Sequence, residues 1–272
     1  MSYASLLVHI DAERPWGGHV SIAVELADRF DACLIGIAGW APRSVAEEAL
    51  AFAPQRVRDM EEMQSLLDQK GNRFCAEFGT SDRKVEWRSV LDDPTDAVIR
   101  EARAADLVII SGSQEQKDLF RAPDPASTVL KAGRPVLVAP RGCASLALRR
   151  AAVAWKDVRE ARRAIVDAVP LLQQAQSVVI VEMLDAGEED GATQRLKDVA
   201  TYLSRHGVKT ITQQARPIDA TAADSLLRMI EEENIDLLVA GAYGHSRLGE
   251  WAFGGMTRDL FRQSPICCLF AH

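Results

Sequence analysis

The stretch Asp236–Val239, Asp-Leu-Leu-Val, repeats the stretch Asp106–Ile109, Asp-Leu-Val-Ile, at a shift of 130 residues along the chain. The same shift brings Pro265 onto Pro135, and each of these prolines precedes a second short apolar run. Two apolar runs that matched by accident would rarely keep one register through the segment between them. Such a repeat indicates duplication of one structural unit. The sequence therefore predicts two copies of a single fold in tandem.

Outward from this repeat, short continuous apolar runs alternate with longer segments of helical period, which is typical of a parallel sheet covered by helices. In the first half we expect strands at 5–10, 32–39, 85–90, 107–111 and 136–139, and helices at 18–30, 44–78, near 94 and at 127–132. In the second half we expect strands at 151–155, 178–183, 208–213, 237–240 and 266–270, and helices at 160–173, 192–206, 220–232 and 257–262. Right-handed crossovers would place helices on both faces of each sheet.

The predicted fold class is therefore α/β, with two tandem Rossmann-like domains that each contain a five-stranded parallel sheet. We expect these domains to span residues 1–141 and 148–272. The stretch Pro140–Ser145 between them is loop-like in composition and is the predicted joint.

The composition, with 47% hydrophobic and 26% charged residues, is that of a soluble globular protein. The net charge of -7 argues against a nucleic-acid partner, because a phosphate-binding surface normally carries a basic excess. The five cysteines form no Cys-x-x-Cys pair, so we predict neither a zinc site nor a redox pair. The first apolar run, about seven residues long, is too short for a membrane span and lacks the basic flank of a signal peptide. We expect a cytoplasmic protein without a membrane partner.

The segment Gly241–Thr257 is the most specific for chemistry, because it leaves the carboxyl end of a buried strand, forms a loop and opens a helix. An α/β sheet binds ligands at such a place, where backbone N–H groups of the loop and of the helix N-terminus converge on an anion. Glycine in the loop permits positive φ angles and close approach of phosphate oxygens. The segment is neither a Walker loop nor a Gly-x-Gly-x-x-Gly fingerprint after the first strand.

The spacing within this segment resembles the universal stress protein family, whose members carry Gly-x-x-Gly, nine residues and then Gly-Ser/Thr around an ATP triphosphate and ribose. Here Gly241 and Gly244 are followed, after nine residues, by Gly254. Gly255 then stands where the family has Ser or Thr, although a hydroxyl returns at Thr257. The resemblance extends over the whole chain in the order of its elements. It implies a stress-response accessory protein that binds ATP, with Mg²⁺ only as the companion of the nucleotide.

The two halves keep different parts of the site that this resemblance implies. Members that bind ATP place an Asp at the end of the first strand, near the adenine and the ribose. Asp11 takes that place in the first half, but the loop there, Ser111–Gln114, lacks the glycine pair, and Asp124–Pro125 replaces the later glycines. In the second half the loop survives, but Lys156 takes the Asp position. Arg247, inside the surviving loop, is a candidate contact for a phosphate.

Structural interpretations stand beside these functional ones. Lys156 either attracts a phosphate with its ammonium group or is a solvated residue at a strand end. Asp11 either contacts a ligand or caps the following helix. His9, on the buried first strand, is interpreted as a core histidine with satisfied hydrogen bonds. Because no base or metal-binding carboxylate can be named beside the loop, we expect no enzyme, or at most a slow ATPase.

Members of the family pair through their final strands, so the resemblance also implies an intramolecular pseudo-dimer of the two domains. The apolar strands at 136–139 and 266–270 agree with this, since each would be an exposed edge unless paired. A homodimer and a protein partner are open alternatives. Two rival functions are a scaffold with a vestigial loop and no nucleotide, and a small-molecule or lipid-binding module that uses the apolar space between the domains.

Overall fold

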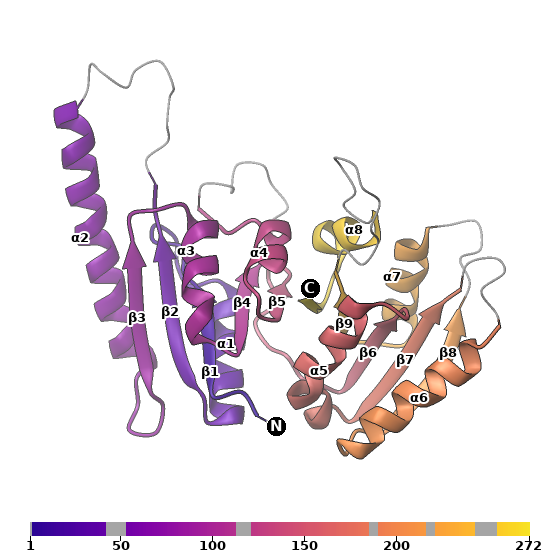
Figure 1. The fold of residues 1–272 in the computed structure, drawn as a ribbon. Helices are drawn as coiled ribbons and strands as arrows, with labels where there is room; N and C mark the ends of the chain where they lie inside the picture. Colours follow the sequence, from indigo (N-terminus) through magenta and orange to yellow (C-terminus); the bar gives the residue numbers. More distant parts are fainter. Residues whose placement is uncertain (1, 42–52, 113–120, 185–189, 216–220, 243–254) are drawn as a thin grey trace.

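The computed structural model describes residues 2–41, 53–112, 121–184, 190–215, 221–242 and 255–272. Ten strands form one sheet in the order β3-β2-β1-β4-β5-β10-β9-β6-β7-β8, with the two halves of the chain side by side (Figure 1). The strands are β1 Ser5–His9, β2 Cys33–Gly39, β3 Val85–Val90, β4 Leu107–Ser111, β5 Val136–Ala139, β6 Arg150–Trp155, β7 Ser177–Met183, β8 Thr210–Ala215, β9 Leu237–Gly241 and β10 Cys267–Ala271. The helices are α1 Gly18–Phe30, α2 Ala53–Phe78, α3 Pro94–Glu101, α4 Pro125–Lys131, α5 Arg159–Gln174, α6 Ala192–Arg205, α7 Ala222–Glu232 and α8 Gly255–Gln263.

The two halves of the sheet meet at their final strands. Within each half neighbouring strands run parallel, whereas β5 and β10 pair antiparallel, with Leu269 opposite Leu137 and Phe270 opposite Val136. All three described residue pairs of this joint are buried, so neither final strand is left as an open edge. The pairing of the final strands is therefore as the sequence led us to expect.

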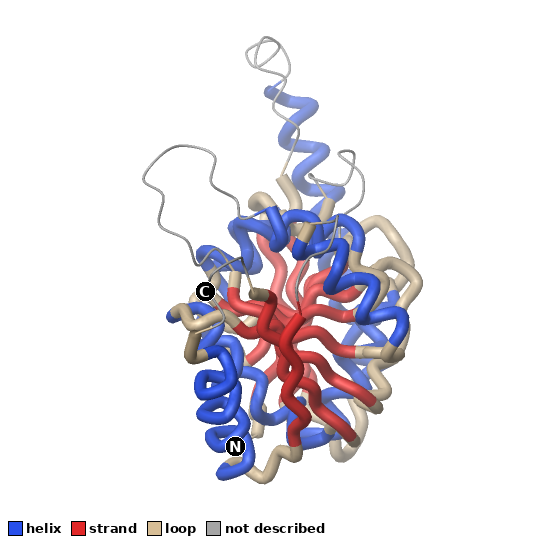
Figure 2. The backbone as a smooth tube through the Cα atoms, turned by 90° about the vertical axis from the view of Figure 1, so that its right-hand side faces the viewer, coloured by secondary structure: helices blue, strands red, loops and turns tan. Residues whose placement is uncertain are grey.

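Helices cover both faces of the sheet (Figure 2). The core on one face packs against α1, α2, α5 and α6, and the core on the other against α3, α4, α7 and α8. Successive residues of a strand point to opposite faces, so Ala151 and Val153 join the first core and Ala152 the second. Burial on both faces explains the continuous apolar runs in the sequence, and the predicted fold class is confirmed. Among the described helices, none combines the length and apolar composition that crossing a bilayer requires.

One aspartate in each half performs the same structural task. Asp106 accepts a hydrogen bond from the backbone N–H of Ser5 at 3.0 Å, and Asp236 accepts one from Arg150 at 3.2 Å. In both halves this bond fastens the start of the first strand to the residue before the fourth. The repeated aspartate is therefore a repeated contact, as duplication requires.

The edge strand β8 begins later than the sequence predicts, at Thr210 instead of Val208. Gly207 has a φ of +78°, and its N–H donates to the carbonyl of Ser204. The N–H of Val208 donates to Leu203 at 3.0 Å, which completes a Schellman motif at the end of α6. Val208 thus belongs to the helix cap and is not free to pair in the sheet.

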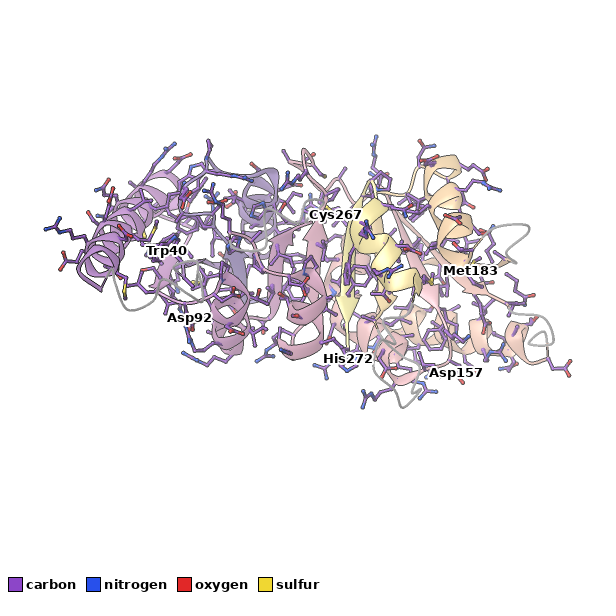
Figure 3. The ribbon with its side chains drawn as sticks, turned by 90° about the horizontal axis from the view of Figure 1, so that it is seen from above. Trp40, Asp92, Asp157, Met183, Cys267 and His272 are labelled. Carbon is purple, nitrogen blue, oxygen red and sulfur yellow. The ribbon has the colours of Figure 1, made fainter. Side chains whose placement is uncertain are left out.

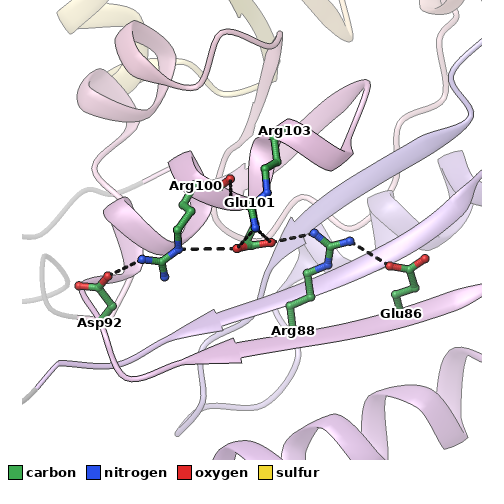
Figure 4. Close-up of polar contacts among 6 residues, drawn as sticks. All are labelled: Glu86, Arg88, Asp92, Arg100, Glu101 and Arg103. Atoms are coloured by element: carbon green, nitrogen blue, oxygen red, sulfur yellow. Dashed lines mark hydrogen bonds and ion pairs between the residues drawn. The ribbon is translucent and has the colours of Figure 1, made fainter.

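The opposite edge strand, β3, is tied to α3 by the half-buried carboxylate of Glu101 (Figure 4). Its oxygens lie 2.7 Å from Arg88, 3.1 Å from Arg103 and 3.6 Å from Arg100. The hydrogen bond to Glu101 is also the main reason why the pKa of Arg88 is raised. These charges hold the edge strand against its helix and place polar groups along it.

Candidate functional site

The candidate site lies where the strand order reverses in each half, between β1 and β4 and between β6 and β9. Ligands of open α/β sheets bind at the carboxyl ends of strands at such a point, because the connections leave in opposite directions and open a crevice. Figure 3 labels Asp157, which follows β6, and His272, which follows β10, at the same side of the second half. The predicted ligand residues of the second half that the structure describes belong to this region.

Gly241, the last residue of β9, packs directly against the first turn of α5. A Cβ atom on Gly241 would stand 2.4 Å from the backbone nitrogen of Ala161 and 2.6 Å from the backbone carbon of Glu160. No side chain fits there without a shift of the backbone. The structure therefore gives this glycine a role in strand–helix packing, which the sequence analysis did not foresee.

The first peptide after β9 is tied to the end of β10. The N–H of Ala242 donates to the carbonyl of Ala271 at 2.9 Å, and the carbonyl of Ala242 lies 3.0 Å from Nδ1 of His272. In the first half Gly112 likewise donates to Ala139 at 2.7 Å. Both N–H groups are already hydrogen-bonded within the sheet, so an anion would have to be bound by groups further along the loop.

Three of the predicted ligand residues, Gly244, Arg247 and Gly254, lie outside the described residues. The description resumes at Gly255, the first residue of α8. Thr257 follows in the first turn with only 7% of its surface exposed. The hydroxyl that the sequence offers in place of the missing Ser or Thr therefore belongs to a buried side chain.

In the first half, α4 corresponds to α8, and a side chain of the protein caps its N-terminus. The carboxylate of Asp124 accepts a hydrogen bond from the N–H of Ser127 at 2.7 Å, and Pro125 follows as the first helical residue. An anion placed there would meet a negative charge and would find this N–H already used. Position 254, the counterpart of Asp124, is a glycine in the second half.

The strand register supports the equivalence of Asp11 and Lys156. Leu6 of β1 pairs with Leu107, and Ala151 of β6 pairs with Leu237, its counterpart in the repeat. Asp11 and Lys156 lie at the same distance along the chain from Leu6 and Ala151. The two halves thus place a carboxylate and an ammonium at the same point of the fold.

The carboxylate of Asp11 is engaged within its own loop. Its Oδ1 accepts hydrogen bonds from the N–H groups of Glu13 at 2.9 Å and Arg14 at 3.2 Å. The suggestion that it caps the following helix is wrong, because α1 begins only at Gly18 and its N-cap is Gly17, without a side-chain hydrogen bond. Asp11 instead stabilises a turn in the long connection between β1 and α1.

Lys156 is half-buried at the start of a much shorter connection. Its carbonyl accepts a hydrogen bond from Val158 at 2.8 Å, and α5 begins at the next residue, Arg159. Val158, the N-cap of α5, makes no side-chain cap. The three residues between β6 and α5 therefore bring the N-terminus of this helix close to the end of β9.

Two histidines beneath the first-half site are held neutral by burial. His9 is 2% exposed, and burial lowers its pKa to about 3; burial also lowers the pKa of His19. Nε2 of His19 donates to the carbonyl of His9 at 2.8 Å. Nε2 of His9 has no hydrogen-bond partner within the described part of the chain, so the expectation of a fully satisfied histidine is not met.

The described residues contain no group of three or more His, Cys, Asp or Glu side chains that could hold a metal ion. They do contain a cavity of about 390 Å³ beside the second-half site, between α5 and α6 over the end of β6. No motif in the sequence indicates this cavity. Its only signal in the sequence is the shortness of the connection between Trp155 and the helix at Arg159.

Comparison with known proteins agrees with this fold and places the chain in a family. The model of the Universal stress protein family matches residues 133–272, just over half of the chain. A universal stress protein from Archaeoglobus fulgidus DSM 4304 has a similar structure, with a TM-score of 0.74 and 14% identity over 98% of this chain and 95% of that chain. A functionally unknown protein from Pseudomonas aeruginosa PAO1 matches with a TM-score of 0.60 and 13% identity, over 99% and 92% of the two chains. Among curated proteins, none matches this sequence significantly.

Proposed function

This chain belongs to the universal stress protein family, and from that premise we propose that it is a stress-response accessory protein whose second half binds ATP or another nucleotide weakly. The five cysteines are free thiols, which fits a reducing compartment, so the proposal places the protein in the cytoplasm. Pairing of β5 with β10 makes the two halves an intramolecular pseudo-dimer. The proposed nucleotide site lies between β6 and β9 at the loop that opens α8.

The observation that carries this proposal is the difference between the N-termini of α4 and α8. In α4 the carboxylate of Asp124 already accepts the N–H of Ser127 at 2.7 Å. In α8 the counterpart positions are Gly254 and Gly255, which bring neither a competing carboxylate nor a proline ring. Helix N-termini and glycine loops bind phosphates through backbone N–H groups, so only the second half suits the triphosphate.

The ribose side of the site supports weak binding. Lys156 stands where ATP-binding members of the family carry an Asp, and an ammonium group cannot accept hydrogen bonds from ribose hydroxyls. Gly255 likewise lacks the hydroxyl that would contact a phosphate. Loss of one hydrogen bond to a charged group costs about 1.5–3 kcal/mol, or roughly one to two decades of affinity.

The same residues indicate that hydrolysis of ATP would be slow at most. Mg²⁺ binds through carboxylates and phosphate oxygens and would enter this site with the nucleotide. Its position would be set by the phosphates, since the second half has lysine at the point where the first half has Asp11. With lysine in place of a carboxylate at position 156, we expect no efficient activation of water for attack on ATP.

Titration with fluorescent ATP, read by anisotropy, tests the proposal. We expect weak binding to the wild-type protein at no more than one site per chain. Gly255→Ser combined with Lys156→Asp should strengthen it at least tenfold, because the pair restores both missing contacts. The matched control is Pro125→Ser, at the first-half counterpart of Gly255, which should change nothing. Tight ATP in freshly purified protein, or two equal sites, would contradict the proposal.

The alternative function is that of a scaffold protein that binds no nucleotide. It would be favoured if the folded double variant gained no affinity at all. Mass spectrometry of small molecules released from freshly purified protein decides the matter independently, because it detects a bound nucleotide without assuming which one it is.

A further inference from the structure

The cavity between α5 and α6 has the size and lining of a small-molecule site. Its volume of about 390 Å³ falls within the range of ligand pockets in proteins. The end of β6, α5 and α6 supply an apolar lining in which Trp155, Ile165, Val199 and Tyr202 take part. It lies on the face of the sheet that α5 and α6 cover, and it shares no described residue with the predicted nucleotide loop.

Two buried polar atoms in or beside this cavity have no hydrogen-bond partner among the described residues. They are Nε1 of Trp155, whose side chain lines the cavity, and Oε2 of Glu182. Only 7% of Trp155 and 4% of Glu182 are exposed. The two residues are register partners on β6 and β7, so their side chains stand next to each other on the same face. A residue with an unpaired buried donor is therefore the neighbour of one with an unpaired buried acceptor, and native proteins rarely leave such atoms unpaired.

The charged groups around the cavity have partners within the protein, and Asp198, which also lines it, accepts a hydrogen bond from Gln194 at 2.7 Å. Arg195 donates to Oε1 of Glu182 at 2.7 Å, and Arg162 lies 2.6 Å from the carboxylate of Asp157. Because each of these arginines already has a carboxylate, the cavity does not select for an anion. A neutral molecule suits it better.

In the first half, a side chain of the protein occupies the place that corresponds to this cavity. The connection between β1 and α1 is longer there and carries Trp16, whose ring lies 5.5 Å from that of Phe78. The ring also lies 4.3 Å from Nζ of Lys70 and 5.2 Å from Cζ of Arg73. Trp16 therefore covers the face of α2 that carries these residues.

The helices α2 and α6 can be compared through their buried residues. Leu196 and Leu203 of α6 and Leu67 and Phe74 of α2 are all fully or almost fully buried. When the first pair is aligned with the second, Val199 corresponds to Lys70 and Tyr202 to Arg73. In the second half these two residues line the cavity. The connection Lys156–Val158 has no aromatic residue to cover them.

We propose that this cavity binds a small neutral aromatic molecule that carries a hydroxyl group. The ring takes the place that Trp16 takes in the first half. The hydroxyl oxygen accepts the N–H of Trp155 and its hydrogen is donated to Oε2 of Glu182, so one group satisfies both atoms. The site is independent of the nucleotide proposal, and either can fail while the other holds.

The test uses three probes that share a fluorinated benzene ring and the full-length protein, with binding followed by ¹⁹F NMR. We expect 4-fluorophenol to bind saturably at one site. 4-Fluoroanisole can accept a hydrogen bond but cannot donate one, and fluorobenzene lacks the oxygen altogether. Both should bind at least tenfold more weakly. Absence of saturable 4-fluorophenol binding to the folded wild-type protein would overturn the proposal.

Three variants separate the polar contact from packing. Trp155→Phe keeps a ring but removes the N–H, so it should weaken 4-fluorophenol about tenfold and leave fluorobenzene unchanged. Val199→Trp should fill the cavity and abolish binding of both probes. The control is Trp87→Phe in the first half, which removes another buried indole N–H without a described partner. It should have no effect on the binding of either probe. Equal weakening of both probes by Trp155→Phe, or undiminished binding to a folded Val199→Trp variant, would refute the assignment.

Discussion

Gly241→Ala, at the end of β9, should destabilise the protein strongly although it adds only one methyl group. The new Cβ would stand 2.4 Å from the backbone nitrogen of Ala161, whereas ordinary contacts of a Cβ atom begin at 3.4 Å. A shift of about 1 Å is therefore required of β9 or α5, and backbone atoms give way less easily than the end of a side chain.

The size of the effect follows from this contact. Overpacking typically costs about 1–3 kcal/mol, and more where the backbone has to move. We expect Gly241→Ala to lose about 3 kcal/mol, which corresponds to a decrease in Tm of roughly 6–12 °C in a protein of this length. Urea unfolding followed by circular dichroism measures the loss of stability directly.

Gly112→Ala is the control, since Gly112 directly follows the equivalent strand in the first half and is the counterpart of Ala242. A Cβ there would stand 3.4 Å from the carbonyl oxygen of Ala139, an ordinary contact, so we expect a change within about 0.5 kcal/mol. If Gly241→Ala unfolded at the same urea concentration as the wild-type protein, with the same slope, the packing argument would be refuted.

This prediction also decides how variants of the nucleotide loop are to be interpreted. A bulky residue at position 241 would displace the N-terminus of α5 whether or not a nucleotide binds there. Loss of ATP binding in Gly241→Val would therefore report damage to the fold. Gly255→Ser and Lys156→Asp are better probes, because neither of them replaces a residue on which the packing of β9 depends.

Three further predictions concern the first half and its contact with the second. Because the pKa of buried His9 is lowered to about 3 from an ordinary 6.5, stability should be complete above pH 6.5 and fall as the pH decreases towards 3, by about 2 kcal/mol at pH 5; His9→Leu should flatten this dependence in urea titrations at several pH values. Asp124→Ala removes the acceptor for the N–H of Ser127 and should cost about 1 kcal/mol, with Asp124→Asn as the control that keeps a cap. Tyr3→Phe loses the 2.6 Å hydrogen bond to the carbonyl of Asp167 between the halves and should cost about 0.5–1.5 kcal/mol; an unchanged unfolding midpoint would contradict this.

The sequence predicts the strands well because their signal is local. A strand buried on both faces is a continuous apolar run, and β4 and β5 have the bounds that these runs indicate. The edge strand β3, Val85–Val90, also has its predicted bounds, although polar residues interrupt its sequence. The start of β8 was missed because Val208 is apolar and buried, as a strand residue would be, yet its N–H completes the cap of α6. Apolar character alone does not show to which element a backbone group is bonded.

The candidate site is less predictable, because its geometry depends on distances between elements that are far apart in sequence. The glycine spacing places Gly241 correctly at the end of a strand, but the contact with Ala161 arises only when α5 packs beside β9. The turn that Asp11 stabilises depends on the length of its loop, which made the helix cap a reasonable but wrong expectation. The cavity beside Trp155 could be predicted only by comparing the connections of the two halves.

One difference between the halves accounts for several of these features together. The connection from the first strand to the first helix runs from Ile10 to Gly17 in the first half and only from Lys156 to Val158 in the second. The long connection has room for the turn at Asp11 and for Trp16, which covers α2. The short connection brings α5 against the end of β9, so a glycine is required at position 241, where the first half has Ser111.

The same short connection leaves Val199 and Tyr202 without an aromatic cover and so creates the cavity beside Trp155. Lengthening it should therefore affect both features at once. If the segment 156–158 is replaced by residues 11–17, Trp16 included, we expect the cavity to close and 4-fluorophenol binding to disappear. The cost of Gly241→Ala should also decrease in that chimera, because a longer connection allows α5 to move away from β9. A folded chimera that kept both phenol binding and the full cost of Gly241→Ala would show that connection length does not control this region.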